Sequence, residues 1–213
     1  MFEVGCQKLD VRSRMSEVGC PIESLTLSSL LTSDLSPQTS DIRLQSSNLK
    51  PQTSTMPTIH LTTFIAAPSE VVFDLSRHVG LHKEAMSTFQ EDAVAGTRFG
   101  LLEKDETVTW KAKHFFRNRL LRVKVTEMKK PEMFTDEQLQ GDFRMMKHEH
   151  YFKPCDNGTI VINLLHYEAP YGLLGQWFNN LFLTRYMKRL LEKRIHTVKS
   201  YAESGKWKNL LAR

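Results

Sequence analysis

The sequence predicts an α+β fold: a curved antiparallel sheet of seven strands, two short helices after the first strand, and one long C-terminal helix. Residues 57–169 consist mainly of short segments in which apolar and polar residues alternate, the period of a half-buried strand. Residues 172–203 instead carry apolar residues at helical spacing. A long helix laid across a curved sheet leaves a hollow beneath it, so we expect an internal cavity.

Residues 1–56 have the composition of a disordered tail. They contain a single aromatic residue, Phe2, although the whole chain has 12 Phe, 5 Tyr and 3 Trp. A segment of this length with one aromatic residue cannot bury enough apolar area to offset its ordering entropy. The segments EVGC and PQTS each occur twice here, but Pro21, Pro37 and Pro51 exclude a coiled coil. The alternative is that translation starts at Met56 and that the preceding residues are an upstream extension.

From Pro57 onward the elements can be placed in order. A first strand over residues 59–66 ends at Ala67-Pro68, where proline suits the first turn of a helix. Two short helices and a loop follow, at residues 69–76, 79–85 and 89–97. Further strands are predicted at residues 98–102, 106–116, 120–128, 131–139, 143–153 and 159–168. The last two of these strands are joined by the hairpin turn Asp156-Asn157-Gly158.

The final helix spans residues 172–203, and Gly205 is well placed to end it. The folded domain therefore covers residues 57–204, followed by a short basic tail at 205–213. The helix carries most of the chain's excess positive charge, which is +5 overall. The basic side chains concerned are Arg185, Lys188, Arg189, Lys193 and Arg194. They predict either a solvated helix face or, as an alternative function, docking on an anionic membrane or acidic partner; no nucleic-acid partner is expected.

Several segments resemble one known superfamily. They are MPTIHLTTFIAAP (56–68), ETVTWKAKHF (106–115), PEMFTDEQLQGDFRMMKHEHYF (131–152), YEAPYGLLG (167–175) and YMKRLLEKR (186–194). They resemble the SRPBCC superfamily, which includes START and pollen-allergen proteins, and within it a bacterial subgroup often labelled "cell division inhibitor" or polyketide-cyclase-like. The resemblance covers nearly all of residues 56–210. It implies a helix-grip fold around a cavity for a hydrophobic or amphipathic molecule, and it brings no catalytic motif. Asn163 departs from the pattern, because an acidic residue is expected there.

Three histidines are predicted to face the cavity. His148 and His150 are two apart on one strand and therefore point the same way, and His114 shares the inner face of its strand with Trp110. Imidazoles on one cavity could bind a metal or relay a proton. Two intervening strands separate His114 from the pair, so we predict hydrogen-bonding wall residues and neither a metal nor a cofactor. The remaining histidines are interpreted as surface or core residues: His60, His78, His82, His166 and His196.

A carboxylate buried beside the histidine pair would favour general-base catalysis. Asp136 and Glu137 are adjacent on one strand and face opposite ways, and strand parity does not decide which lies inside. The catalytic candidates are His148, His150 and Glu137, with Asp136 left open. The predicted ligand-binding residues are Trp110, His114, His148, His150, Phe152, Tyr167, Trp177 and Phe178.

Binding or transport of a hydrophobic small molecule is the predicted function, without catalysis. The alternative is a cyclase, dehydratase or hydrolase that uses the cavity histidines and a carboxylate. Phosphate-binding glycine loops, a nucleophile elbow and an HExxH motif are absent from the sequence.

The ligand is expected to enter near the loops at 89–96 and 170–175. Three cysteines without metal or disulfide spacing, and no apolar stretch of membrane length, predict a cytoplasmic protein.

Overall fold

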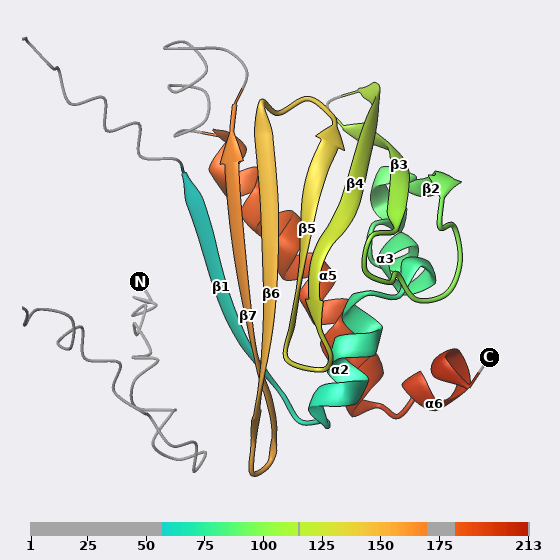
Figure 1. Cartoon of the computed structure of the whole chain (residues 1–213), viewed down its shortest axis with the longest axis vertical. Helices are drawn as coiled ribbons and strands as arrows, with labels where there is room; N and C mark the ends of the chain where they lie inside the picture. The colour runs from blue at the N-terminus through green and yellow to red at the C-terminus, as the bar shows by residue number, and fades with distance from the viewer. Residues whose placement is uncertain (1–56, 115, 170–181, 213) are drawn as a thin grey trace, which may run out of the picture.

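A computed structural model describes residues 57–114, 116–169 and 182–212. The predicted tail at 1–56 and the first part of the predicted C-terminal helix lie outside the described residues. Seven strands form one antiparallel sheet in the order β1-β7-β6-β5-β4-β3-β2. Helix α5 (Thr184–Glu203) runs across one face of this sheet, and two short helices follow the first strand (Figure 1). The predicted α+β helix-grip fold is confirmed.

The elements have the following bounds. The strands are β1 (Thr58–Ile65), β2 (Asp92–Gly96), β3 (Thr107–His114), β4 (Arg117–Lys129), β5 (Met133–Gln140), β6 (Met145–Cys155) and β7 (Gly158–Glu168). The helices other than α5 are α2 (Ser69–Ser76), α3 (Val79–Ala85), the 3₁₀ turn η1 (Ser87–Phe89) and α6 (Trp207–Leu211). None of the helices in the described part of the chain is long and apolar enough to cross a bilayer.

The second strand lies elsewhere than predicted. Residues 98–102 form no strand, and only Leu101 makes an isolated bridge, to His78. The strand is β2, in a segment predicted to be a loop. Its sequence DAVAG buries Ala93 alone, and its register with β3 shifts between Ala93 and Ala95. The apolar alternation that marks a strand is therefore missing, because an edge strand with a bulge has little to bury.

The predicted alternation is confirmed on β3 and β6. On β3 the buried residues are Val108, Trp110 and Ala112. On β6 every second residue from Met146 to Phe152 is buried, which includes both histidines of the HEH segment. The inner face of the sheet thus presents residues of one parity to α5.

One end of the molecule is closed by a compact aromatic cluster. Phe73 of α2 packs edge-on against Phe134 and Phe152, with ring centroids 5.7 and 5.3 Å apart. Ile195 and Val198, from the C-terminal half of α5, are buried in the same cluster. Residues of α6 also pack against it, namely Trp207, Leu210 and Leu211. The segment predicted as a basic tail therefore includes a short helix that belongs to the folded domain.

We expect Phe73→Ala to lower the free energy of unfolding by about 3–5 kcal/mol, because it leaves a cavity beside the two buried rings of Phe134 and Phe152. Urea unfolding followed by circular dichroism measures the change. Phe99, which is 75% exposed, supplies the matched control, since Phe99→Ala should alter stability by no more than about 0.5 kcal/mol. Equal losses in the two variants would contradict the assigned core.

Candidate functional site

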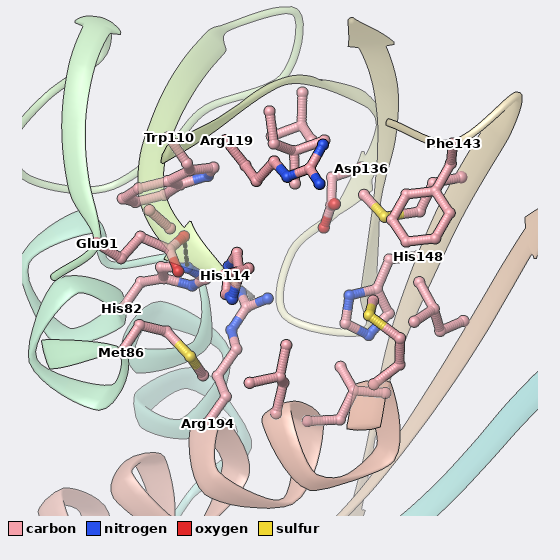
Figure 2. Close-up of a pocket in the computed structure, with 18 of the residues that line it drawn as sticks. His82, Met86, Glu91, Trp110, His114, Arg119, Asp136, Phe143, His148 and Arg194 are labelled. Atoms are coloured by element: carbon pink, nitrogen blue, oxygen red, sulfur yellow. Dashed lines mark hydrogen bonds and ion pairs between the residues drawn. The ribbon is translucent and has the colours of Figure 1, made fainter. Parts of the chain in front are cut away.

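A cavity of about 540 Å³ lies between the N-terminal half of α5 and the inner face of the sheet. Its walls come from β3 to β7, from α3 and the segment after it, and from α5 (Figure 2). Most of the lining is apolar. The apolar lining residues include Leu121, Val123, Val125, Phe134, Met146, Leu165, Leu183, Met187, Leu190 and Leu191. The hollow expected from the order of elements is therefore present on the helix-covered face.

One polar part of the wall combines α3 with β3. The ring of His82 stacks on Trp110 at a centroid distance of 4.2 Å. His82 Nε2 also contacts Glu91 Oε1 at 3.0 Å, and the Glu91 side chain is only 9% exposed. All three residues line the cavity. Trp110 is a predicted ligand contact, whereas the sequence marks His82 only as a surface or core residue and does not single out Glu91.

A second polar group lies where the β3–β4 turn approaches α5. His114 Nδ1 and the hydroxyl of Tyr186 are 2.6 Å apart. Burial lowers the pKa of His114. Close by, Arg119 forms an ion pair with Asp142 at 3.1 Å, and both residues line the cavity. The His114–Tyr186 contact joins the end of β3 to the first turn of α5, and the Arg119–Asp142 pair adds two charged side chains to the same wall.

The histidine pair lies on the opposite wall with a carboxylate. His148 and His150 have ring centroids 3.8 Å apart, and Asp136 Oδ2 lies 3.0 Å from His150 Nε2. Antiparallel register places Asp136 directly opposite His148 on the neighbouring strand. The ring of His150 stacks on Phe134, with centroids 4.2 Å apart. His148 Nε2 is buried and has no hydrogen-bond partner among the described residues.

Burial makes both imidazoles of the pair hard to protonate. His148 and His150 are 4% and 2% exposed, and loss of water around them lowers both pKa values well below the ordinary 6.5. The positive charge of Arg194 lowers both pKa values further, while the side chain of Asn163 acts in the opposite direction. Both rings are therefore neutral at pH 7, with lone pairs available.

Arg194 is the main correction to the predicted site. The sequence groups it with the exposed basic residues of the last helix, but its side chain reaches from α5 into the cavity (Figure 2). Its Nη2 donates to the carbonyl oxygen of Ser76 at 2.9 Å. Burial lowers the pKa of Arg194, while the charges of Asp136 and Glu91 raise it. An arginine inside an apolar cavity is a strong candidate for contact with a polar part of a guest.

The other predicted site residues divide as follows. Trp110, His114 and His148 line the cavity. His150 does not line the cavity; it lines an adjoining space of about 10 Å³, roughly the size of one water molecule, which His148 and Arg194 also line.

Two predicted aromatic contacts are core residues, and two are outside the described part. Phe152 belongs to the aromatic cluster. Tyr167 is fully buried, and its hydroxyl lies 2.8 Å from Thr184 Oγ1. Trp177, Phe178 and the expected entrance at 170–175 fall outside the described residues. The other expected entrance, at 89–96, is occupied by the end of η1 and by β2.

Glu137, the named carboxylate candidate, faces away from the cavity. It lies opposite Lys147 in the β5–β6 register, on the face that carries Lys147 and Glu149. Asp136 is the carboxylate that lines the cavity. The reason is parity: Asp136 shares the inner face of β5 with Phe134.

The sequence contains a pattern from which the position of Arg194 in the cavity could have been predicted. It lies seven residues after Met187, four after Leu190 and four before Val198, and so occupies the apolar stripe of α5. No comparable signal marks His82 or Glu91, because their contacts join segments that sequence spacing does not relate.

Fold and site together define a helix-grip protein with an internal cavity. No protein-family model and no curated protein matches the chain. Among solved structures, TTHA0849 from Thermus thermophilus is 19% identical, with 70% of this chain and 99% of that chain covered and a TM-score of 0.56. A START superfamily protein from Mycobacterium smegmatis is 12% identical, with 69% and 97% covered and a TM-score of 0.53. For Ara h 8.0201 the identity is 10%, the coverage 70% and 99%, and the TM-score 0.52. At these identities the likeness establishes the fold that the sequence resemblance implied.

We expect the protein to lose stability as the pH falls below about 7. The folded pKa values of His148 and His150 are depressed, so the unfolded chain binds more protons than the folded protein below the unfolded pKa of about 6.5. Each histidine then contributes a slope of up to about 1.4 kcal/mol per pH unit. Urea unfolding at about pH 7.5 and about pH 5.5 measures this slope.

Replacing the pair by glutamine, His148→Gln with His150→Gln, should reduce the pH dependence and leave the contribution of His78 and His114, whose pKa values burial also lowers. His196 is exposed, and His196→Gln should leave the dependence unchanged. A slope that persists in full after the double substitution would contradict the assignment to this pair.

Proposed function

We propose that this protein binds a hydrophobic or amphipathic small molecule in the cavity and does not convert it chemically. The observation that carries the proposal is the largely apolar cavity of about 540 Å³ beneath α5. Its size falls within the range of roughly 300–1,000 Å³ that is typical of small-molecule sites. Burial of an apolar guest there gains roughly 25 cal/mol for each Å² removed from water. The helix-grip fold supports the same proposal.

The polar side chains suggest how an amphipathic guest would be oriented. Arg194, Asp136 and His148 all reach the cavity, Arg194 from the helix and the other two from the sheet (Figure 2). Because buried polar groups without partners are costly, a guest that supplies hydrogen-bonding atoms here is favoured over a pure hydrocarbon. We therefore place the polar end of the guest between these three side chains and its apolar part toward Leu121 and Met187.

The catalytic alternative has weaker support. It rests on the Asp136–His150 contact, since a carboxylate that orients a histidine is the usual arrangement of a general base. His150, however, is not among the residues that line the cavity, and the nitrogen that contacts Asp136 is already occupied. A general base must come within hydrogen-bonding distance of the proton that it removes. His148 and Asp136 do line the cavity, and the proposal uses them as hydrogen-bonding groups for the guest.

Filling the cavity should abolish binding without unfolding the protein. Leu121 lines the cavity, and Leu121→Trp adds bulk to that wall. We expect this variant to lose at least about tenfold in affinity for the fluorescent probe 1-anilinonaphthalene-8-sulfonate, a loss of about 1.4 kcal/mol, while its melting temperature stays near that of the wild type. Val94 is 41% exposed on β2, so Val94→Trp adds the same side chain outside the cavity and should bind the probe normally. Unchanged binding in Leu121→Trp would refute the proposed site.

A second candidate function, docking on an anionic membrane, is favoured by a specific feature of the β3–β4 turn. Phe116 is 97% exposed at this turn, and Leu120, which follows on β4 and lines the cavity, is 52% exposed. The neighbouring His114 contacts Tyr186 on the first turn of α5, so the turn lies beside the cavity. An exposed aromatic side chain at such a position can enter the interfacial region of a bilayer.

Charge supports a membrane as the partner. Between residues 111 and 124 the chain carries no acidic residue, and its basic residues are Lys111, Lys113, Arg117, Arg119, Arg122 and Lys124. Lys113 and Arg117 are exposed and form no ion pair with a described residue. On α5, the exposed residues Arg185, Lys188 and Arg189 extend the positive surface, whereas Lys193 donates to Thr88. The docking surface is thus centred on the β3–β4 turn rather than on the whole helix.

Sedimentation with phosphatidylglycerol–phosphatidylcholine vesicles tests docking. Lys113→Glu with Arg117→Glu should weaken partitioning by about thirtyfold, at about 1 kcal/mol for each basic residue, and added salt should weaken it as well. Lys129 and Lys153 are exposed, and the strand registers place both at the opposite end of the sheet from Arg117, so Lys129→Glu with Lys153→Glu makes the same change of charge as a control. Equal partitioning of the two double variants would rule out docking at this turn, while probe binding in the cavity would be unaffected.

A further inference from the structure

We infer that Asp136, His148 and His150 form a binding site for one divalent first-row metal ion, with Zn²⁺ as the representative ion. The three side chains come from two neighbouring strands and share the inner face of the sheet. Each offers one ligand atom, and these atoms all lie within 4.8 Å of one another. Two imidazoles and a carboxylate are a ligand set that suits zinc and other first-row ions.

The backbone already supplies most of the geometry. Residues two apart on a strand project to the same side, so the His-Glu-His segment presents both imidazoles together. Asp136 faces His148 across the β5–β6 ladder, and its Oδ2 is 3.0 Å from His150 Nε2. Ligand atoms around a tetrahedral zinc ion are about 3.3 Å apart, given metal–ligand distances of about 2.0–2.1 Å. The Asp136–His150 pair is already near this spacing, and side-chain rotations that bring the more distant atoms, up to 4.8 Å apart, toward it would complete the site.

His148 provides the independent sign that a ligand is missing. Its Nε2 has no hydrogen-bond partner among the described residues, although the residue is only 4% exposed. A buried polar atom without a partner costs about 1–3 kcal/mol, and natural proteins seldom tolerate it. The same side chain lines the cavity, so an ion at Nε2 would be reachable from there.

The surroundings keep the two imidazole ligands in the ionisation state that a metal ion requires. Metal ligands must be deprotonated, and burial keeps both imidazoles neutral. Asn163, opposite His150 on β7, interacts with both rings and can hold their orientation from behind. The positive charge of Arg194 opposes a cation, while the negative charges of Asp136 and Glu91 offset it.

Such an ion would have coordination positions left over. Three protein ligands leave at least one open site in a four-coordinate zinc centre. Asp136 and His148 both line the cavity, so the open position would face the interior. This inference is independent of the proposed ligand binding, because the ion could bind a polar atom of the guest or stabilise the sheet without a guest.

Metal titration of the full-length, untagged protein tests the inference. After treatment with a chelator, Zn²⁺ is titrated in competition with a chromophoric indicator, and Co²⁺ is titrated to record its visible absorption. We expect one equivalent to bind and the Co²⁺ spectrum to show a low-coordinate nitrogen–oxygen environment. Asn163→Ala should weaken binding by about 10–100-fold, the usual effect of losing a residue that orients metal ligands.

His148→Ala should abolish the Zn²⁺ equivalent, and circular dichroism establishes that the variant is folded. His114 faces the same cavity outside the cluster, so His114→Ala should retain full binding. A wild-type protein that binds no Zn²⁺ overturns the inference without any variant. Stoichiometric binding that survives in His148→Ala also overturns it, because the ion then lies elsewhere, for instance on the cysteines. Neither result bears on whether the cavity binds the fluorescent probe.

Discussion

Everything about this molecule depends on α5 being held against the sheet along its C-terminal turns. There Ile195, Val198 and Ala202 are buried against the rings of Phe73 and Phe134. Along the preceding turns the helix and the sheet both line the cavity, where the β3 and β4 residues range from Ala112 and Val123 to Trp110 and Leu121. Since interiors are otherwise close-packed, a hollow of this size requires that the helix be held away from the sheet there. The phenylalanines thus set the distance between helix and sheet that the cavity needs.

Within that apolar space, a few polar side chains decide what the cavity can recognise. Burial favours the neutral forms of His148 and His150 and strengthens every remaining electrostatic contact. Arg194 and Asp136 approach from opposite walls without forming a direct ion pair in the described structure; Arg194 donates to the Ser76 carbonyl oxygen, and Asp136 contacts His150. The proposed ligand site and the inferred metal site both draw on this group. They use it differently, because the first needs Arg194 and the second needs the pair of imidazoles.

Strand alternation and helical spacing are enough to predict the fold, but they fail where burial is slight. The β3 and β6 strands are predicted correctly because every second residue is buried. The β2 segment is predicted as a loop because it buries Ala93 alone and contains a bulge. In the site, alternation places His114 and His148 on the cavity wall. It also places Phe152 there, but this ring packs into the aromatic cluster. Parity gives the face of the sheet on which a residue lies and not whether it lies beside the cavity or beside the cluster.

Sequence alone thus determined the fold class, the existence of a hollow and the shared face of His148 and His150, because these follow from local periodicity. Tertiary structure decided between Asp136 and Glu137, moved Arg194 from the surface into the cavity and brought His82 onto Trp110. These outcomes depend on the register between strands and on how helices approach the sheet. Both are set by contacts between residues far apart in the chain, which no local pattern records.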